Sequence, residues 1–134
     1  MAEYRVTIKG FDSGLNELLA AQKSTYDRRT KRMRVANPEK AKNDKLCLKN
    51  IWRDMHGVHI DKPIEVYYHI YAKDKKHDRP NIGYAFCKSF LDALQMAKVI
   101  DSDGWDHVIN THFEYDISKD NPRVEVFIKV IGDD

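Results

Sequence analysis

The sequence predicts a single α+β domain over residues 1–134, in which one mixed β-sheet of about four strands packs with two long helices. Three observations predict this fold. Several segments alternate apolar and polar residues with period two, two others repeat apolar residues every three or four positions, and no internal repeat or linker divides the chain. The expected order is β-α-β-α-β-β. With 134 residues, of which 42% are hydrophobic, the chain is long enough to bury a core.

The first half of the chain begins with a strand, because residues 3–11 (EYRVTIKGF) alternate. Residues 12–26 fit either a short helix or an ordered loop. Residues 26–38 (YDRRTKRMRVANP) show no regular period and predict an exposed basic loop. A helix is expected to begin at Pro38, with Asn37 as its cap. Its apolar face is predicted from spacing at Leu48, Ile51, Trp52 and Met55.

The second half predicts a central strand at residues 64–73 (IEVYYHIYAK), because both of its alternating sets are largely apolar. A second long helix is expected to open at Pro80. Residues 107–115 and 123–131 read as two further strands. The turn formers between them predict that they pair as an antiparallel hairpin. The core face of the second helix is predicted at Ile82, Phe86, Ser89, Phe90, Ala93, Leu94 and Ala97.

The net charge of +2 conceals an uneven distribution. Residues 23–53 hold eleven Lys or Arg and three acids, a net charge of +8. Residues 101–134 hold nine acids and three bases, a net charge of −6. The basic half favours a polyanion partner and the acidic half favours a metal. Two solvated faces without a partner are the alternative.

The composition argues against several classes of protein. No apolar run approaches the ~20 residues of a membrane span, and the first residues do not resemble a signal peptide. Cys47 and Cys87 fall in predicted helices, and their spacing fits neither a zinc motif nor a disulfide framework. The sequence therefore predicts a cytoplasmic protein with reduced thiols and no membrane partner.

Acidic residues flank the second helix. Asp78 precedes it, Asp101 and Asp103 follow it, and Lys88 and Asp92 share one stripe of its surface. If the following loop folds back along that stripe, carboxylates and a lysine would share one site suited to Mg²⁺ or Mn²⁺. Such a metal could activate water for attack on a phosphate. The alternative is a helix-dipole aspartate, an i,i+4 ion pair and two turn residues.

The same stretch resembles the signature of the RusA-type Holliday junction resolvases, many of which come from phages and prophages. The resemblance is carried in order by "KKHDRPNI", "CKSFLDAL" and "KVIDSDGWDHV". The upstream segment "FDSGLNELLAAQKSTY" and the closing "NPRVEVFIKV" also resemble that family. One clear departure is Pro80, which stands where the family has a second acid. His77 stands where the family has Arg or Lys.

The resemblance implies a homodimer that uses Mg²⁺, with Mn²⁺ as a substitute, to cut four-way DNA junctions symmetrically in the cytoplasm of a bacterial host. It implies no small-molecule cofactor. The implied catalytic residues are Asp78, Lys88, Asp92, Asp101 and Asp103, of which Asp78, Asp92 and Asp103 bind the metal. Asp103 matches the later catalytic aspartate better than Asp101 does.

The basic segment supplies the expected DNA contacts, because lysines and arginines bind phosphates without reading bases. A catalytically weak or silent binder of branched or single-stranded DNA with the same fold is the main alternative. A small interaction protein with no nucleic-acid role is a third. The residues predicted to contact DNA are Asn16, Lys23, Arg28, Arg29, Lys31, Arg32, Arg34, Lys42, Lys45, Lys49, His77 and Asn81.

Overall fold

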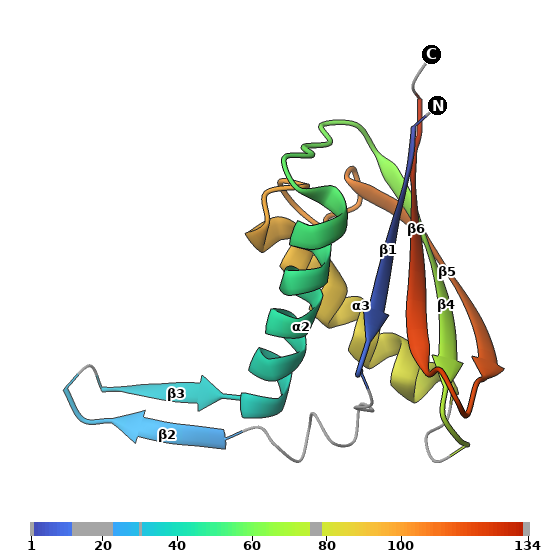
Figure 1. The fold of residues 1–134 in the computed structure, drawn as a ribbon. Coiled ribbons are helices and arrows are strands. Elements are labelled where there is room, and N and C mark those ends of the chain that lie inside the picture. The colour runs from blue at the N-terminus through green and yellow to red at the C-terminus, as the bar shows by residue number, and fades with distance from the viewer. Residues whose placement is uncertain (1, 12–22, 30, 76–78, 133–134) are drawn as a thin grey trace.

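Two helices lie on one face of a four-stranded sheet (Figure 1) in the computed structural model, which describes residues 2–11, 23–29, 31–75 and 79–132. The sheet has the order β1 (Glu3–Lys9), β6 (Arg123–Val130), β4 (Ile64–Ala72) and β5 (Val108–Ile117). The helices are α2 (Pro38–Met55) and α3 (Arg79–Met96). A separate hairpin is formed by β2 (Lys23–Asp27) and β3 (Arg32–Ala36). The mixed α+β class and the central place of residues 64–73 are confirmed.

The predicted hairpin between the last two strands is wrong. β5 pairs in parallel with β4, and β6 lies between β1 and β4, antiparallel to both. Burial explains this arrangement. Val124, Val126 and Ile128 of β6 are almost fully buried, whereas the outermost strand β5 has no buried residue. The strand that is most apolar on its core face thus takes a central position, and α3 becomes the crossover between the parallel strands β4 and β5.

The basic segment is also more ordered than the loop that its sequence predicts. β2 and β3 pair antiparallel around a tight turn, where Lys31 has a φ of 55°. The hairpin projects from the start of α2, away from the sheet (Figure 1). Residues 12–22, including the expected helix or loop and Asn16, lie outside the described part of the chain.

Both helices bury one face against the sheet. α3 buries the predicted residues Phe86, Ser89, Phe90, Ala93 and Leu94, which confirms most of its core face. The α2 face is rotated from the prediction. Cys47, Ile51 and Met55 are buried, whereas Trp52 is 50% exposed and lies against the His56 ring at a tilt of 36°. No helix in the described ranges is long and apolar enough to cross a membrane.

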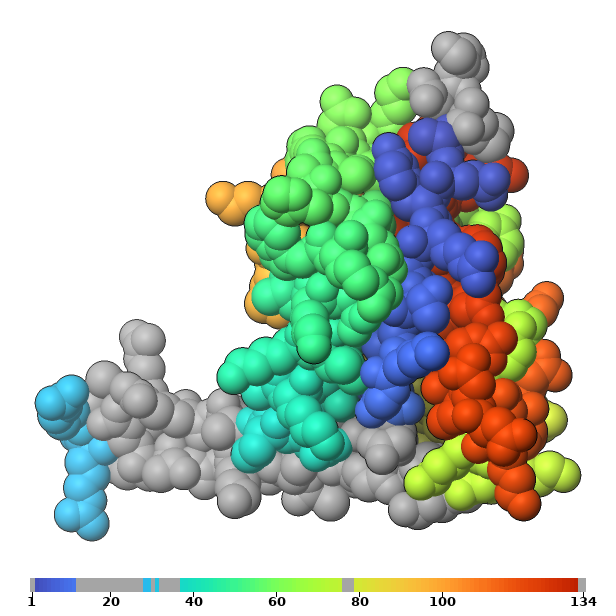
Figure 2. Space-filling view, in the orientation of Figure 1, coloured from blue at the N-terminus to red at the C-terminus, as the bar shows by residue number. Residues whose placement is uncertain are grey.

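The start and end of α2 are fixed by polar contacts. Pro38 takes the first helical position, and the Asn37 side chain accepts a hydrogen bond from the Lys40 backbone N–H at 3.1 Å, as predicted. Near the other end, Arg53 donates to the Thr7 carbonyl and Asp54 accepts from the Thr7 N–H, at 2.7 and 3.1 Å. These two side chains satisfy backbone groups on the edge of β1, which lies along α2 (Figure 2).

Gly83 sets how closely α3 approaches β5. A Cβ atom at this position would lie 2.2 Å from the Tyr115 hydroxyl oxygen and 3.1 Å from Cδ1 of Phe113. Real atoms do not approach so closely, so any larger residue would push the helix and the strand apart. The absence of a side chain at Gly83 therefore lets the middle of α3 rest on the rings of β5.

Candidate functional site

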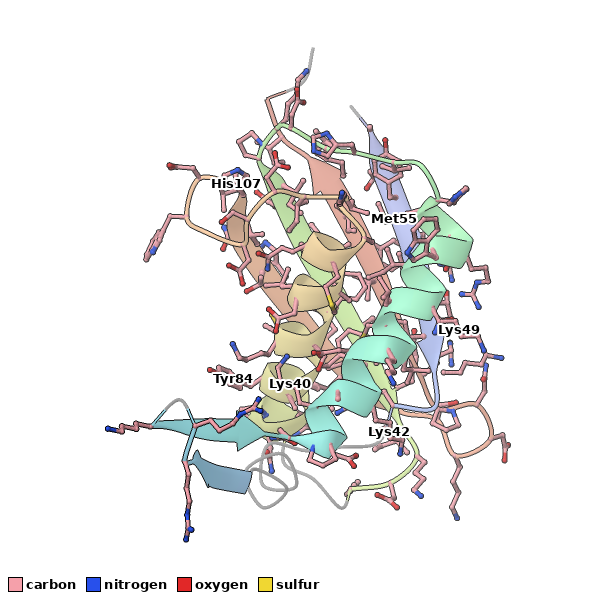
Figure 3. All side chains as sticks on the ribbon, turned by 90° about the vertical axis from the view of Figure 1, so that its left-hand side faces the viewer. Lys40, Lys42, Lys49, Met55, Tyr84 and His107 are labelled. Carbon is pink, nitrogen blue, oxygen red and sulfur yellow. The ribbon has the colours of Figure 1, made fainter. Side chains whose placement is uncertain are left out.

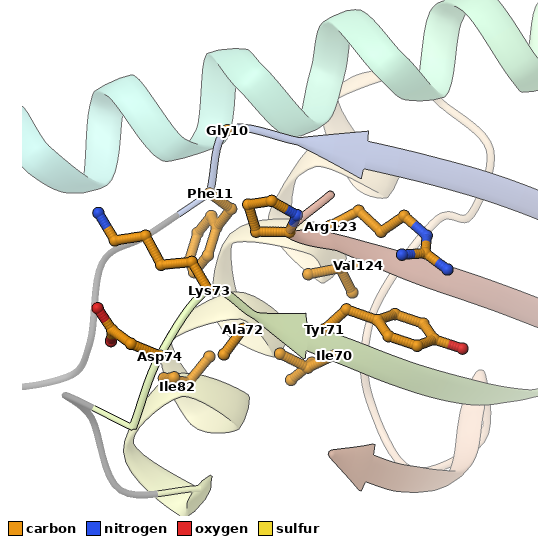
Figure 4. Close-up of a pocket in the computed structure, with 11 residues that line it drawn as sticks. Gly10, Phe11, Ile70, Tyr71, Ala72, Lys73, Asp74, Ile82, Arg123 and Val124 are labelled. Atoms are coloured by element: carbon orange, nitrogen blue, oxygen red, sulfur yellow. The ribbon is translucent and has the colours of Figure 1, made fainter. Parts of the chain in front are cut away.

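The candidate site lies along α3, which begins where β4 ends. Because β4 and β5 are parallel, their carboxyl ends lie together at this edge of the sheet, beside the N-terminus of α3. A pocket here is lined by Phe11, Ile70, Ala72 and Ile82, with Lys73 and Asp74 at its rim (Figure 4). A second pocket, on the β5 side of Ile70, is lined by Arg79 and Tyr115. Carboxyl ends of parallel strands and helix N-termini are frequent ligand sites in proteins.

The loop after α3 packs against the segment that precedes β4. Its path is held by backbone hydrogen bonds from Ile60 N–H to the Val99 carbonyl (2.7 Å) and from Ile64 N–H to the His107 carbonyl (2.8 Å). The His107 N–H also donates to the Gly104 carbonyl at 3.0 Å. These bonds fix both ends of the loop against the segment that precedes β4.

The charge of Asp103, in the loop after α3, reaches Cys87 of that helix. Burial raises the pKa of the Cys87 thiol, and the neighbouring Tyr68 hydroxyl lowers it. The Asp103 carboxylate raises this pKa further, and the Lys88 ammonium lowers it. Cys87 is nine residues before the end of α3, so the loop turns back toward the helix rather than away from it.

Asp101 points elsewhere. Its carboxylate lies 3.2 Å from Nε2 of His59, in the segment that joins α2 to β4. Asp101 and Asp103 are only two residues apart, yet the first contacts this segment and the second faces α3. The two aspartates thus lie in different surroundings, and the preference of the family resemblance for Asp103 stays a prediction.

Asp92 is part of an ion-pair brace between the helices. Lys40 of α2 donates to Asp92 of α3 at 2.6 Å and to Asp44 at 2.8 Å (Figure 3 labels Lys40). The three side chains are 18–32% exposed, so water screens them only in part. Burial lowers the pKa of Lys40, but the hydrogen bonds and charges of Asp44 and Asp92 outweigh it and raise the pKa overall. Asp92 is thus held as a structural partner of α2.

The predicted metal ligands do not converge in the described part of the chain. Asp92 is engaged by Lys40, Asp103 lies beside Cys87, and Asp78 is outside the described residues. Within the described ranges, no group of three or more His, Cys, Asp or Glu side chains is placed to hold a metal ion. The three metal ligands predicted from the sequence, Asp78, Asp92 and Asp103, therefore stay a prediction.

The predicted DNA-binding residues fall into separate groups. Arg28, Arg29 and Lys31 are exposed at the tip of the β2–β3 hairpin. Lys23, Arg32 and Arg34 lie on its strands, and their side chains are not described. Lys42, Lys45 and Lys49 are exposed on α2, and Figure 3 shows Lys42 and Lys49 on the side of α2 away from α3. Asn81 is partly buried and has a partner, and His77 lies outside the described residues.

The structure adds residues that the sequence did not single out. Arg79, Gly83 and Cys87 follow one another at helical spacing, and all three lie next to Tyr115 of β5. Burial raises the pKa of Tyr115, whereas the Arg79 charge lowers it. Trp105, in the same loop as Asp103, is 94% exposed. In the sequence, the sign of this row is that Arg79, Gly83 and Cys87 are spaced four residues apart, which places them on one side of a helix.

Comparisons with known proteins add no evidence about this site.

No model of a known protein family matches the chain, and no curated protein matches it.

The row on α3 therefore carries the chemical argument by itself. Arg79 of this row and Tyr115 of β5 line the pocket at the helix N-terminus, and the charges of Lys88 and Asp103 both act on Cys87 of the row. Cations at this spacing can hold an anionic ester, and a carboxylate can accept a proton or bind a metal.

The position of Asp103 can be tested through Cys87, because Cys47 is fully buried and Cys87 is partly exposed. Asp103→Asn should lower the Cys87 pKa and speed its alkylation by iodoacetamide at pH 8, by roughly twofold. Lys88→Met should slow it. Asp106→Asn, in the same loop, is the matched control and should leave the rate unchanged. An unaltered rate in both Asp103→Asn and Lys88→Met would mean that the loop does not fold back.

The brace should be visible in the pH dependence of stability. Because the folded pKa of Lys40 is raised, its stabilising effect is complete below its ordinary pKa of 10.5 and is lost as the pH rises through the raised value. Lys40→Met should cost about 1–3 kcal/mol of unfolding free energy at pH 7 and should flatten the loss above pH ~10.5. Denaturant melts across pH would measure this. Lys42→Met, exposed on the same helix, should change stability by less than about 0.5 kcal/mol.

Proposed function

We propose that this protein is a structure-selective endonuclease that hydrolyses phosphodiester bonds in branched DNA, such as four-way junctions. The observation that carries the proposal is that Asp103 and Lys88 both act electrostatically on Cys87, so the loop after α3 brings a carboxylate near the part of the helix that holds the lysine. A basic hairpin that projects from the same end of the molecule as the α3 N-terminus supports a DNA substrate (Figure 1).

In this proposal the residues of α3 hold the scissile phosphate. Arg79 and Lys88 offset the charge that builds on the phosphate oxygens, and Tyr115, near Arg79, is a hydrogen-bond donor. Asp78 and Asp103 are the proposed ligands for Mg²⁺ or Mn²⁺, which when bound would lower the pKa of a water molecule and neutralise phosphate charge. Pro80 supplies no ligand, so these two carboxylates carry the metal between them.

The hairpin and the symmetry of the substrate complete the proposal. Arg28, Arg29 and Lys31 contact the DNA backbone without reading its sequence. The protein acts as a homodimer, because paired cuts across a junction require two sites related by a two-fold axis. The proposed setting, a phage or prophage protein in the bacterial cytoplasm, follows from the resemblance of its motifs to RusA-type resolvases.

A catalytically weak or silent binder of branched or single-stranded DNA is the second candidate. It is favoured by the engagement of Asp92 with Lys40 and by Pro80, which together leave few carboxylates for a metal. The two candidates differ in one measurement. The enzyme nicks a synthetic four-way junction when Mg²⁺ or Mn²⁺ is added, whereas the binder only shifts it on a gel.

Removing either proposed metal ligand should separate binding from cleavage. Asp78→Asn and Asp103→Asn should bind a four-way junction as tightly as the wild type, or more tightly because phosphate repulsion falls. Each should cut at least ~100-fold more slowly, which corresponds to about 2.7 kcal/mol of lost transition-state stabilisation. Single-turnover cleavage of a labelled junction measures the rate. Asp106→Asn serves as the control and should cut normally, and wild-type rates in both test variants would refute this site.

The hairpin should govern the salt dependence of DNA binding. Changing Arg28, Arg29 and Lys31 together to Gln should reduce the log–log salt slope of the junction affinity by up to ~2.7, since each phosphate contact contributes ~0.9. Fluorescence anisotropy over a range of salt concentrations measures the slope. The matched triple change of Lys62, Lys98 and Lys119 to Gln should alter it far less. Equal slopes in the two triple variants would show that the hairpin is merely solvated.

A further inference from the structure

The sheet has a second face that the helices do not touch. Among the residues that the structure describes, no helix or strand lies over it, and Figure 1 shows α2 and α3 on the opposite side. We call this the open face. The strand registers align its side chains in rows across the sheet. The four rows, each in the order β1, β6, β4, β5, are Lys9, Arg123, Tyr71, Asp116; Thr7, Glu125, His69, Glu114; Arg5, Phe127, Tyr67, His112; and Glu3, Lys129, Glu65, Asn110.

The open face is lined by flat rings. Tyr67 stacks on His112 with centroids 4.4 Å apart and an interplanar angle of 9°, and His69 stacks on Tyr71 at 4.1 Å and 16°. The Arg123 guanidinium lies 3.8 Å from the centroid of the Tyr71 ring. Phe127 lies next to Tyr67 in the neighbouring strand and remains 36% exposed. The stacked rings and Phe127 form an apolar centre on the open face, around a shallow hollow lined by Tyr67, His112 and Phe127, into which side chains of a partner can pack.

The charges of the open face are divided between its halves. The β1–β6 half carries Arg5, Lys9, Arg123 and Lys129 against Glu3 and Glu125, a net charge of +2. The β4–β5 half carries Glu65, Glu114 and Asp116, a net charge of −3 with neutral histidines. A surface that is basic on one half and acidic on the other complements a copy of itself turned over.

We propose that the open face is the homodimer interface, with a second copy packed sheet to sheet about a two-fold axis that runs parallel to the strands, between β6 and β4. The inference deepens the proposed function, because it rests on the homodimer named there. The axis places β1 of one copy over β5 of the other, and β6 over β4. Each basic half then meets an acidic half.

The rows match under this axis. Lys9 faces Asp116 of the second copy, and Phe127 faces its Tyr67. Two further pairs are complementary, namely Arg123 with Tyr71 and Lys129 with Glu65. An axis perpendicular to the strands would instead place Arg123 over Lys129, so the charges select the parallel axis.

The size of the face and its position in the molecule agree with this arrangement. Four strands ~4.8 Å apart and about eight residues long make a surface whose burial in two copies is on the order of 1,000 Å² or more, enough for a specific dimer. The parallel axis also leaves both α3 N-termini and both basic hairpins at the same end of the dimer, as Figure 1 makes evident for one copy. Two sites at one end can engage a single branched DNA.

Charge reversal at Lys9 and Asp116 tests the proposal, because these residues lie on opposite edge strands of one copy but face each other in the dimer. K9E and D116K homodimers each contain two repulsive contacts and should dissociate at least ~10-fold more readily than the wild type. A mixture of the two variants should form heterodimers of wild-type affinity, since both contacts then become attractive. Sedimentation velocity with the full-length chains measures association, and thermal melts confirm that each variant folds.

The outcomes distinguish this interface from the proposed function itself. Lys98→Glu, exposed at the end of α3, is the matched control and should dimerise like the wild type. If K9E and D116K each dimerise normally, or if the mixture does not recover, the inferred interface is wrong while a dimer through another surface remains. If the wild type is a monomer at micromolar concentration, both the interface and the paired-cut model fall. A metal-dependent nick by that monomer would still support the endonuclease.

Discussion

The parallel pairing of β4 with β5 is the constraint on which the rest of the structure depends. Parallel neighbours need a crossover, and α3 supplies it, so the helix begins at the carboxyl ends of the two strands and ends where β5 starts. Eleven residues separate α3 from β5, more than this junction needs. The extra length turns the loop back toward the helix, so that the charge of Asp103 reaches Cys87. Gly83 lets the helix lie close enough to β5 for Tyr115 to join the same row.

Helix α2 packs against this unit mainly through α3 and β1, and its Lys40 makes the polar contact with α3. Asp92, which the family resemblance marks as catalytic, accepts a hydrogen bond from Lys40 at 2.6 Å. Lys40 sits in the first turn of α2, directly after the hairpin. The ion pair therefore fixes where the basic hairpin leaves the body relative to α3. In the proposed endonuclease, Asp92 would contribute to DNA binding by holding these two elements in register.

Helix starts and single strands could be predicted from the sequence, whereas strand pairing and contacts between distant residues could not. The Asn37–Pro38 helix start and the central strand at residues 64–73 depend on neighbouring residues, and both are confirmed. The pairing of β5 depends on which strand buries its face most fully, and turn residues cannot report that. Helical spacing suggested Lys88 as the partner of Asp92, whereas the partner found, Lys40, lies 52 residues away. Likewise only the path of the chain after Met96 separates Asp101, beside His59, from Asp103.

The open face of the sheet and the site on α3 are related, because the way two copies pack through the open face decides where their two sites lie. A sheet covered on one face only must leave its other face to solvent or to a partner, and here that face carries stacked rings and divided charge. Only a two-fold axis parallel to the strands keeps both α3 N-termini at one end. A perpendicular axis would send them to opposite ends, where one branch point could not reach both. The charge pattern on the open face and the geometry of the proposed branched substrate therefore select the same axis, although they involve different residues on opposite sides of the sheet.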